Sequence, residues 1–160
     1  MNKFIPIHIY SDGSYFEKQD IGGWGMVIFK DKQELLRLSG WQKYASSLEM
    51  ELKAALNALQ QLEYRLSPLE SYQITLFTDS RILIEGLSQK IKLWRQTHWI
   101  HKSGNPIKYQ PLWEALDALT QHHHIQWQWV KAHNGNHGNT LVDQLAREAV
   151  AERLQINVVS

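Results

Sequence analysis

The segment from Phe4 to Ser14 reads Phe-Ile-Pro-Ile-His-Ile-Tyr-Ser-Asp-Gly-Ser. Isoleucines occupy every second position from residue 5 to residue 9, and this period-2 pattern predicts a β-strand with one buried face. The residues Asp12-Gly13-Ser14 are typical of a turn, so we expect the strand to end there. The first strand would then carry an aspartate at its carboxyl end.

Two more strands are predicted directly after the first. Residues 24–29 form an apolar run, residues 34–38 form another candidate strand, and a short polar turn over residues 30–33 separates them. Connections this short join antiparallel neighbours. The first three strands should therefore form an antiparallel unit.

From residue 47 onwards, predicted helices and strands follow one another. Apolar side chains recur at helical spacing from Ser47 to Tyr64. Similar reasoning predicts strands over residues 72–78 and 125–129, and helices over residues 81–87, from Pro111, and after a cap at Asn139 or Thr140. A strand that follows a helix most simply returns parallel to the first strand. The sequence thus predicts one α/β domain over residues 1–160, with a mixed five-stranded sheet flanked by helices.

Composition excludes several classes of protein. Lys and Arg number 17 and Asp and Glu 16, which leaves a net charge of +1, so the molecule as a whole is not a polycation that would bind nucleic acid or membranes nonspecifically. The absence of cysteine excludes disulfides, thiolate zinc sites, iron–sulfur clusters and cysteine nucleophiles. No apolar run approaches the roughly 18 residues of a membrane span. We expect a cytoplasmic protein without a membrane partner.

Two aspartates follow strands that should be adjacent and parallel. Asp12 comes after the first strand, and Asp79 comes directly after the strand over residues 72–78. Because the carboxyl ends of parallel strands meet at one edge of a sheet, both side chains should emerge there. Two neighbouring carboxylates repel each other, so either one is protonated at a raised pKa or a hard cation lies between them.

Three further positions are candidates for the same site. Glu49 and Glu51 border opposite edges of the apolar stripe of the 47–64 helix, and periodicity alone does not choose between them. Asp143 falls in the first turn of the last helix, where the helix macrodipole favours a carboxylate without any functional need. His133 lies in a segment rich in glycine and asparagine, which favours a proton carrier or a gate.

Five segments, in order and over nearly the whole chain, make the sequence similar to type 1 ribonuclease H. They are Asp-Gly-Ser at 12–14, Glu-Leu-Lys-Ala at 51–54, Thr-Asp-Ser at 78–80, Trp-Val-Lys-Ala-His at 129–133 and Asp-Gln-Leu-Ala-Arg-Glu-Ala at 143–149. The resemblance implies the ribonuclease H fold. It also implies an endonuclease that cuts the RNA strand of an RNA/DNA hybrid and leaves 3′-hydroxyl and 5′-phosphate ends.

Carried over residue by residue, the resemblance makes Asp12, Glu51, Asp79 and Asp143 the metal-binding acids and His133 the mobile histidine. It implies two Mg²⁺ ions with the substrate, with Mn²⁺ as a substitute. Mg²⁺ is typically bound by a few carboxylates together with water and substrate phosphate. A pair of such ions about 4 Å apart can hold the attacking water and the leaving oxygen of an in-line displacement. We expect Asp12 to bridge the two ions, and His133 to assist proton transfer or product release.

A basic segment over residues 90–108 is the candidate surface for nucleic acid. It contains no Asp or Glu, and its cations and aromatic side chains include Lys90, Lys92, Trp94, Arg95, Trp99, Lys102 and Lys108. Cations that track phosphates are the simplest reason for this clustering. The segment lies where the resembled family has a basic protrusion that holds the DNA strand. For the two tryptophans, a place in the core is an equal alternative.

The RNA strand is distinguished by its 2′-hydroxyls. Candidates to contact it are backbone groups at Gly13 and Ser14 and the side chains of Ser46 and Ser47, and Asn139 completes the set of nucleic-acid-binding candidates. The sequence departs from the family at residues 15–20, where many bacterial members have a Gly-Asn-Pro-Gly stretch. It departs again at residues 46–49, where an asparagine-containing turn is common. Both departures bear on hybrid affinity and strand discrimination, and neither touches the acids.

Two alternatives belong to other functional classes. One is another nuclease of the same fold, such as a junction resolvase or a relative of DNA-cutting transposases. The other is a hybrid-binding module without activity, which would be expected to lack some of the carboxylates. The intact acids and the segment around His133 favour a ribonuclease H that binds an RNA/DNA hybrid and acts as a monomer.

Overall fold

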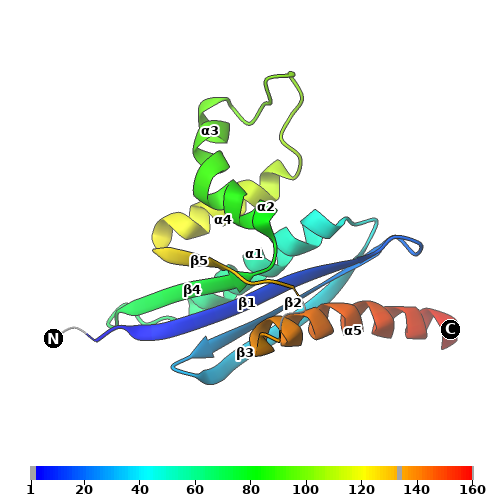
Figure 1. Ribbon diagram of the computed structural model, residues 1–160, viewed down its shortest axis with the longest axis horizontal. Coiled ribbons are helices and arrows are strands. Elements are labelled where there is room, and N and C mark those ends of the chain that lie inside the picture. The colour runs from blue at the N-terminus through cyan, green and yellow to red at the C-terminus, as the bar shows by residue number, and fades with distance from the viewer. Residues whose placement is uncertain (1–2, 133–134, 160) are drawn as a thin grey trace.

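The computed structural model describes residues 3–132 and 135–159 and contains one five-stranded sheet (Figure 1). The strand order is β3-β2-β1-β4-β5, antiparallel from β3 to β1 and parallel from β1 to β5. This confirms the predicted mixed sheet. The strands are β1 (Ile5–Phe16), β2 (Ile21–Lys30), β3 (Gln33–Lys43), β4 (Tyr72–Thr78) and β5 (Ile125–Trp129).

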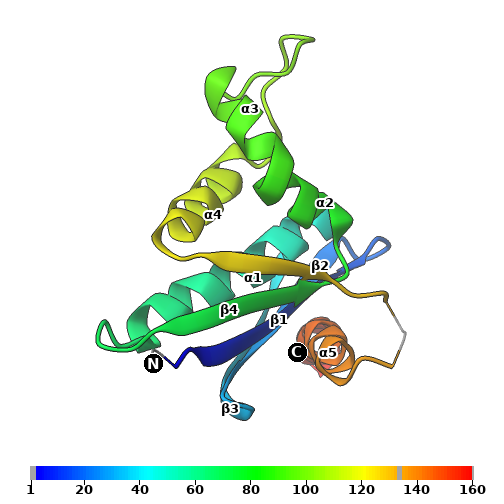
Figure 2. The same ribbon diagram turned by 60° about the vertical axis from the view of Figure 1, so that its left-hand side comes forward.

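Helices cover both faces of the sheet, as the two views in Figures 1 and 2 show. Helix α1 packs on β1 and β2 from one side, with α4 against it, and α5 packs on β1, β2 and β3 from the other side. None of the described helices is long and apolar enough to cross a membrane. The helices are α1 (Ser47–Arg65), α2 (Arg81–Glu85), the π-helix η1 (Gly86–Lys90), α3 (Ile91–Gln96), α4 (Gln110–His122) and α5 (His137–Val159).

The main core lies between α1 and the sheet. Alternate residues of β1 and β4 point into it, and so does the apolar stripe of α1. Burial of these side chains is the principal force that holds α1 against the strands. The largest of the fully buried side chains there include Ile7, Ile9, Met26, Leu52, Leu59, Leu62 and Leu76.

The prediction that β1 ends at Asp12-Gly13-Ser14 is wrong. The strand continues to Phe16, because β2 pairs with it from Ile7, opposite Lys30, as far as Phe16, opposite Ile21. Gly13 is required for close approach rather than for a turn. A Cβ atom at residue 13 would lie 2.6 Å from the backbone nitrogen of Glu51, so only glycine lets α1 come this near to the strand.

The predicted hairpin between β2 and β3 is present with a tighter turn. Asp31 and Lys32 are its two central residues, and both have positive φ angles, of 50° and 70°. Two successive residues in this region are typical of the type I′ turn that matches the twist of a hairpin. Both strands are also longer than their apolar patterns indicate.

Two helix boundaries differ from the predictions. The helix from Arg81 does not stop near Gly86 but continues through η1 into α3, and Gly86 is needed because a Cβ there would lie 2.3 Å from the ring of Trp113. Helix α5 begins at His137, and the Asn136 side chain accepts a hydrogen bond from the Asn139 N–H at 2.9 Å. Asn136 therefore caps the helix, in place of Asn139 or Thr140.

Candidate active site

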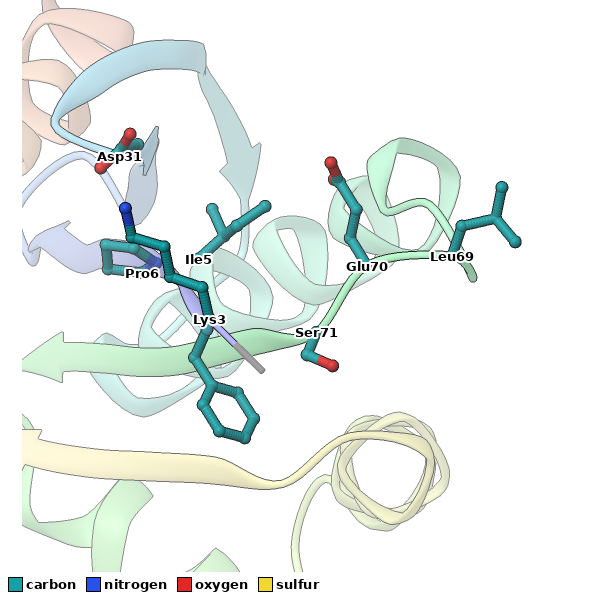
Figure 3. A pocket seen from close by; sticks show the side chains of 8 residues that line it. Lys3, Ile5, Pro6, Asp31, Leu69, Glu70 and Ser71 are labelled. Carbon is teal, nitrogen blue, oxygen red and sulfur yellow. The ribbon is translucent and has the colours of Figure 1, made fainter. Parts of the chain in front are cut away.

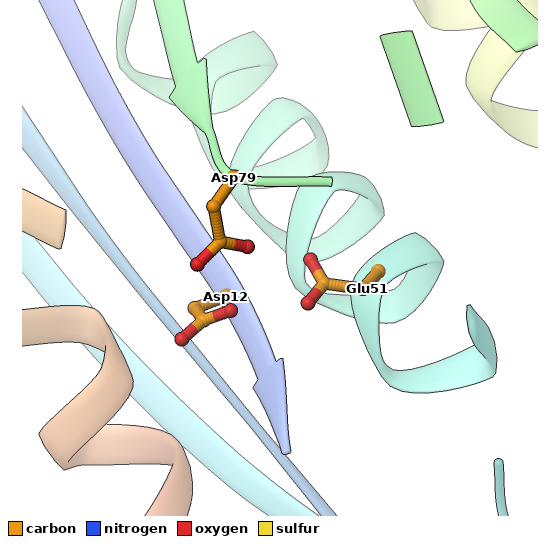
Figure 4. A group of neighbouring side chains, drawn as sticks. All are labelled: Asp12, Glu51 and Asp79. Atoms are coloured by element: carbon orange, nitrogen blue, oxygen red, sulfur yellow. The ribbon is translucent and has the colours of Figure 1, made fainter. Parts of the chain in front are cut away.

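Three carboxylates from three separate elements point toward one another (Figure 4). Asp12 comes from β1, Glu51 from the second turn of α1, and Asp79 from the residue after β4. Oxygen atoms of the three side chains all lie within 4.8 Å of one another. We call Asp12, Glu51 and Asp79 the acid cluster.

Strand register explains why the two aspartates meet. Tyr10 lies opposite Phe77 in the parallel pairing of β1 and β4, and the aspartates each follow two residues later. Asp12 thus lies just beyond the end of the parallel pairing, although β1 itself continues. This is the juxtaposition that the sequence predicts, reached within a strand rather than at its end.

Glu51 joins the cluster because Gly13 allows α1 to touch β1. The Gly13 N–H donates to Asp12 Oδ1 at 2.9 Å and also to Glu51 Oε1 at 3.1 Å. Glu49 is elsewhere: it lies in the first turn of α1, and its backbone N–H donates to the capping Ser46 Oγ at 3.1 Å. Between the two glutamates that periodicity left open, the fold thus brings Glu51 to the aspartates.

The acid cluster is electrostatically strained. Burial, followed by the charge of Asp79, raises the pKa of Asp12 to about 8, against the partial opposition of hydrogen bonds with Glu51 and Gly13. Burial, followed by the charge of Asp12, also raises the pKa of Glu51 well above its usual value. In addition, Glu51 Oε2 is buried without a hydrogen-bond partner among the described residues. A hard divalent cation would relieve both the repulsion and the unpaired oxygen.

Asp143 lies beside the acid cluster rather than in it. Its side chain is 27% exposed on α5, and Arg147 Nη1, one turn further along the helix, is 3.6 Å from its Oδ2. Its charge contributes to the raised pKa of Asp12. The structure thus brings together three of the four predicted acids and places the fourth nearby. His133, the predicted mobile histidine, lies outside the described residues.

An open groove of about 770 Å³ runs along the edge of the acid cluster. Arg81 lines this groove and was not singled out from the sequence, whereas Trp129 belongs to the 129–133 segment named there. The Arg81 guanidinium lies 4.4 Å from the centre of the Trp129 ring, and the indole N–H of Trp129 donates to the backbone oxygen of Asp79 at 3.3 Å. One signal could have indicated Arg81, since a cation at the first position of a helix opposes the macrodipole. The lining residues are Ser47, Leu48, Glu51, Asp79, Ser80, Arg81, Ile82, Trp129, Lys131 and Ala132.

The predicted nucleic-acid contacts near the acid cluster divide into two groups. Ser47 is exposed and lines the groove, and Ser14 is half-buried in β1. The others are engaged within the protein: the Gly13 N–H bonds two carboxylates, Ser46 caps α1, and Asn139 is buried inside α5.

The basic segment shows the same division. Lys90 and Lys92 are exposed, as are Lys102 and Lys108. Arg95 instead forms an ion pair with Asp117 of α4, with 3.0 Å between Nε and Oδ2. Trp99 is 8% exposed and belongs to the core, and the Trp94 ring packs 5.1 Å from that of Trp113 and 5.8 Å from that of Trp99. The tryptophans thus hold the segment together, and its lysines face solvent.

A second hollow, of about 490 Å³, lies at the opposite end of β1 (Figure 3). Its charged side chains, Lys3, Asp31 and Glu70, differ in sign and belong to the amino-terminal ends of β1 and β4 and the β2–β3 turn. It gathers no cluster of carboxylates comparable to that of Asp12.

Comparison with known proteins shows the family to which this chain belongs. The family model described as RNase H matches residues 6–151. The chain belongs to the ribonuclease H family. Ribonuclease H of Bartonella bacilliformis is 37% identical over 149 residues, which cover 93% of this chain and 92% of that protein. Ribonuclease HI of Xylella fastidiosa is 40% identical over 148 residues, which cover 92% of this chain and 94% of that protein.

Solved structures agree on the fold. LC9-RNase H1, a type 1 RNase H with the type 2 active-site motif, superposes with a TM-score of 0.78 at 22% identity, over 94% of this chain and 74% of the other. LC11-RNase H1, solved in complex with an RNA/DNA hybrid, gives 0.70 at 18% identity, over 92% and 99% of the two chains. The predicted ribonuclease H fold and family are confirmed. Ribonucleases H depend on metal ions, and the acid cluster is a group of described residues that could hold one.

Proposed function

We propose that this ribonuclease H hydrolyses the RNA strand of RNA/DNA hybrids at the acid cluster and leaves 3′-hydroxyl and 5′-phosphate ends. The observation that carries the proposal is the convergence of Asp12, Glu51 and Asp79 within 4.8 Å in a chain of this family. The 160 residues act as one domain built on a single sheet, and a monomer is sufficient because the acid cluster is formed within one chain. A chain without cysteine suits a reducing cytoplasm.

Mg²⁺ is the metal that best suits an all-carboxylate site, with Mn²⁺ as a substitute. Asp12, Glu51, Asp79 and Asp143 would hold two ions, with Asp12 shared between them. When bound, such ions activate a water molecule and stabilise the leaving 3′-oxygen.

The protein's own groups prepare this site. The Gly13 N–H fixes one oxygen of Asp12 and one of Glu51, so that their other oxygens remain available. The raised pKa values mean that Asp12 and Glu51 release protons when a cation binds. His133 assists proton transfer or product release.

The hybrid lies along the groove beside the acid cluster. Ser47, which lines the groove, and Ser14, two residues after Asp12 on β1, contact the RNA strand, and the exposed Lys90 and Lys92 follow phosphates of the DNA strand. Cleavage is directed at RNA because the 2′-hydroxyl is the group that separates RNA from DNA at such contacts.

The test compares four labelled substrates of one sequence: RNA/DNA hybrid, duplex RNA, duplex DNA and single-stranded RNA. Each is incubated with Mg²⁺, with Mn²⁺ and with a chelator. Asp12→Asn is the test variant, and Asp31→Asn is the matched control, because Asp31 is an exposed aspartate in the turn at the other end of the sheet. We expect cleavage of the hybrid RNA alone, lost with chelator and with Asp12→Asn. Cleavage of duplex DNA, or binding without cleavage under both metals, would refute the proposal.

A further inference from the structure

The basic segment projects away from the sheet. Figures 1 and 2 show α3 and the loop after it projecting beyond the layer formed by α1 and α4. Two contacts join the segment to α4: Arg95 with Asp117, and Trp94 with Trp113. They do not by themselves place its lysines relative to the acid cluster. Tyr109, directly after the segment, makes a contact of a different kind.

The Tyr109 hydroxyl meets the amino-terminal end of α1. Tyr109 Oη lies 2.5 Å from Ser46 Oγ, and the two residues are 63 positions apart in sequence. Ser46 is the N-cap of α1, the helix that carries Glu51 in its second turn. A serine hydroxyl has two lone pairs and one proton, so Ser46 can accept from the Glu49 N–H and still bond to Tyr109. One hydrogen bond therefore connects the end of the basic segment to the helix of a cluster acid.

The backbone at Tyr109 is held in a conformation that costs free energy. Its φ of 63° and ψ of 31° are left-handed, a conformation that tyrosine adopts at a cost and that glycine or asparagine adopts readily. Such a conformation persists when surrounding contacts impose it. Here the contacts are the hydrogen bond with the Ser46 hydroxyl, the packing of the ring against the hydrophobic core, and the Lys108 ammonium, which lies 5.2 Å from the centre of the ring.

We propose that Tyr109 is a positioning residue that fastens the basic segment to α1, so that the lysines of the segment and the acid cluster bind the same hybrid. This inference rests on the proposed function. Tyr109 acts through Lys90, Lys92 and their neighbours and does not touch the reacting atoms. Without the bond, the segment would still fold against α4, but it would hold a less defined position relative to Glu51.

Tyr109→Phe tests this directly, because it removes the hydroxyl and keeps the ring beneath Lys108. For a long hybrid that reaches the basic segment, we expect KM to rise about 3- to 10-fold, the range of one hydrogen bond. The value of kcat should change by less than about twofold. A short hybrid that occupies the acid cluster but does not reach the basic segment should be cut by the variant at the same rate as by wild type. Hydrogen exchange should become faster over residues 91–108.

Two controls separate positioning from other roles. Tyr64 is 84% exposed near the other end of α1, so Tyr64→Phe removes a tyrosine hydroxyl far from Ser46 and should change none of these readings. In a Ser46→Ala background, the effect of Tyr109→Phe should disappear, because the partner is already absent.

Three results would overturn the inference. They are an unchanged KM on the long hybrid, an equal loss on short and long hybrids, and a changed KM with unchanged hydrogen exchange, which would mean direct contact with substrate. If wild type cut no hybrid, the proposed function would fail on its own. Hydrogen exchange and the affinity for uncut hybrid in chelator would still decide the role of Tyr109.

Discussion

The acid cluster and the basic segment differ in how the fold holds their charges. Asp12, Glu51 and Asp79 come from two paired strands and a helix locked together by Gly13, and Asp12 and Glu51 are buried against each other. The lysines of the basic segment are exposed on a projection fastened to the body by α2, α4 and Tyr109. Chemistry needs fixed atoms, so the acids are placed by strand register. Phosphate contacts set the register and orientation of a bound duplex, so the lysines need a support that is placed relative to the acids but not held to the precision that the chemistry requires.

The largest expected effect is a loss of activity without a loss of hybrid binding when the acid cluster is changed. Asp12→Asn removes the central carboxylate, and kcat on the hybrid should fall about 1,000-fold or more. The affinity for hybrid in chelator should stay within about threefold, because without metal the pKa of Asp12 is raised to about 8, so this carboxyl is already largely uncharged near pH 7. Single-turnover cleavage and fluorescence anisotropy measure the two quantities. A variant that cuts normally would remove Asp12 from the site.

The next prediction concerns the close packing of α1 on β1 that places Glu51 in the acid cluster. In Gly13→Ala, the new Cβ would lie 2.6 Å from the Glu51 nitrogen, so α1 must move away from β1. We expect the Mg²⁺ dependence to shift to about 10- to 100-fold higher concentration, the range for loss of groups that orient metal ligands. Metal titrations of the cleavage rate would show this. Gly104→Ala offers a contrast, since nothing lies within 4 Å of its Cβ position, although its φ of 90° adds local strain.

A third prediction concerns pH and stability. The ordinary pKa of Asp12 is 3.8, and burial and the charge of Asp79 raise it to about 8 in the folded protein. Between these values the folded state binds a proton that the unfolded state does not, so the free energy of unfolding should fall as pH rises. We expect a loss of about 1–3 kcal/mol from pH 5 to pH 8 without metal. Urea unfolding at both pH values measures it.

Two comparisons sharpen that test. In Asp12→Asn the fall in stability between pH 5 and pH 8 should be much smaller, because the titrating carboxyl has gone. In wild type at pH 8, added Mg²⁺ should restore stability, since it binds only the folded state. A metal-free protein that is more stable at pH 8 than at pH 5 would contradict the strain assigned to the acid cluster.

The smallest expected effect belongs to the basic segment. Replacing both Lys90 and Lys92 by alanine should raise KM for the hybrid about tenfold and reduce the salt dependence of binding by about one phosphate contact per lysine. The value of kcat should remain near that of wild type. Arg65→Ala, which removes an exposed cation at the end of α1, is the control. If kcat fell with KM unchanged, the lysines would act in the chemistry and the contrast between the regions would be lost.

Local patterns predict the elements well where polar or turn residues bound an apolar stretch. The β4 span over residues 72–78 and the β5 span over residues 125–129 match to the residue. The end of β1 is not predictable in this way. Asp-Gly-Ser is typical of a turn, and these residues stay in the strand because they pair with residues of β2 that lie further along the chain. The continuous helix past Gly86 has the same origin, since the reason for that glycine is Trp113 on another helix.

The residues of the site also divide into those that the sequence predicts and those that it does not. Asp12 and Asp79 are predictable because strand order and parallel pairing bring them together. Glu51 needs the family resemblance or the structure, because Glu49 borders the same apolar stripe. Tyr109 has no local signal, since its partner is 63 residues away. The burial of Trp99 is likewise decided by neighbours from other parts of the chain.

The most direct test of the acid cluster as a metal site is a calorimetric titration of the protein with Mg²⁺ near pH 7, repeated in buffers with different ionisation enthalpies. The dependence of the heat on the buffer gives the protons released on binding. Because the pKa values of Asp12 and Glu51 are raised without metal, wild type should release protons and Asp12→Asn should release fewer. Binding with no proton release, or binding unchanged in Asp12→Asn, would contradict the account.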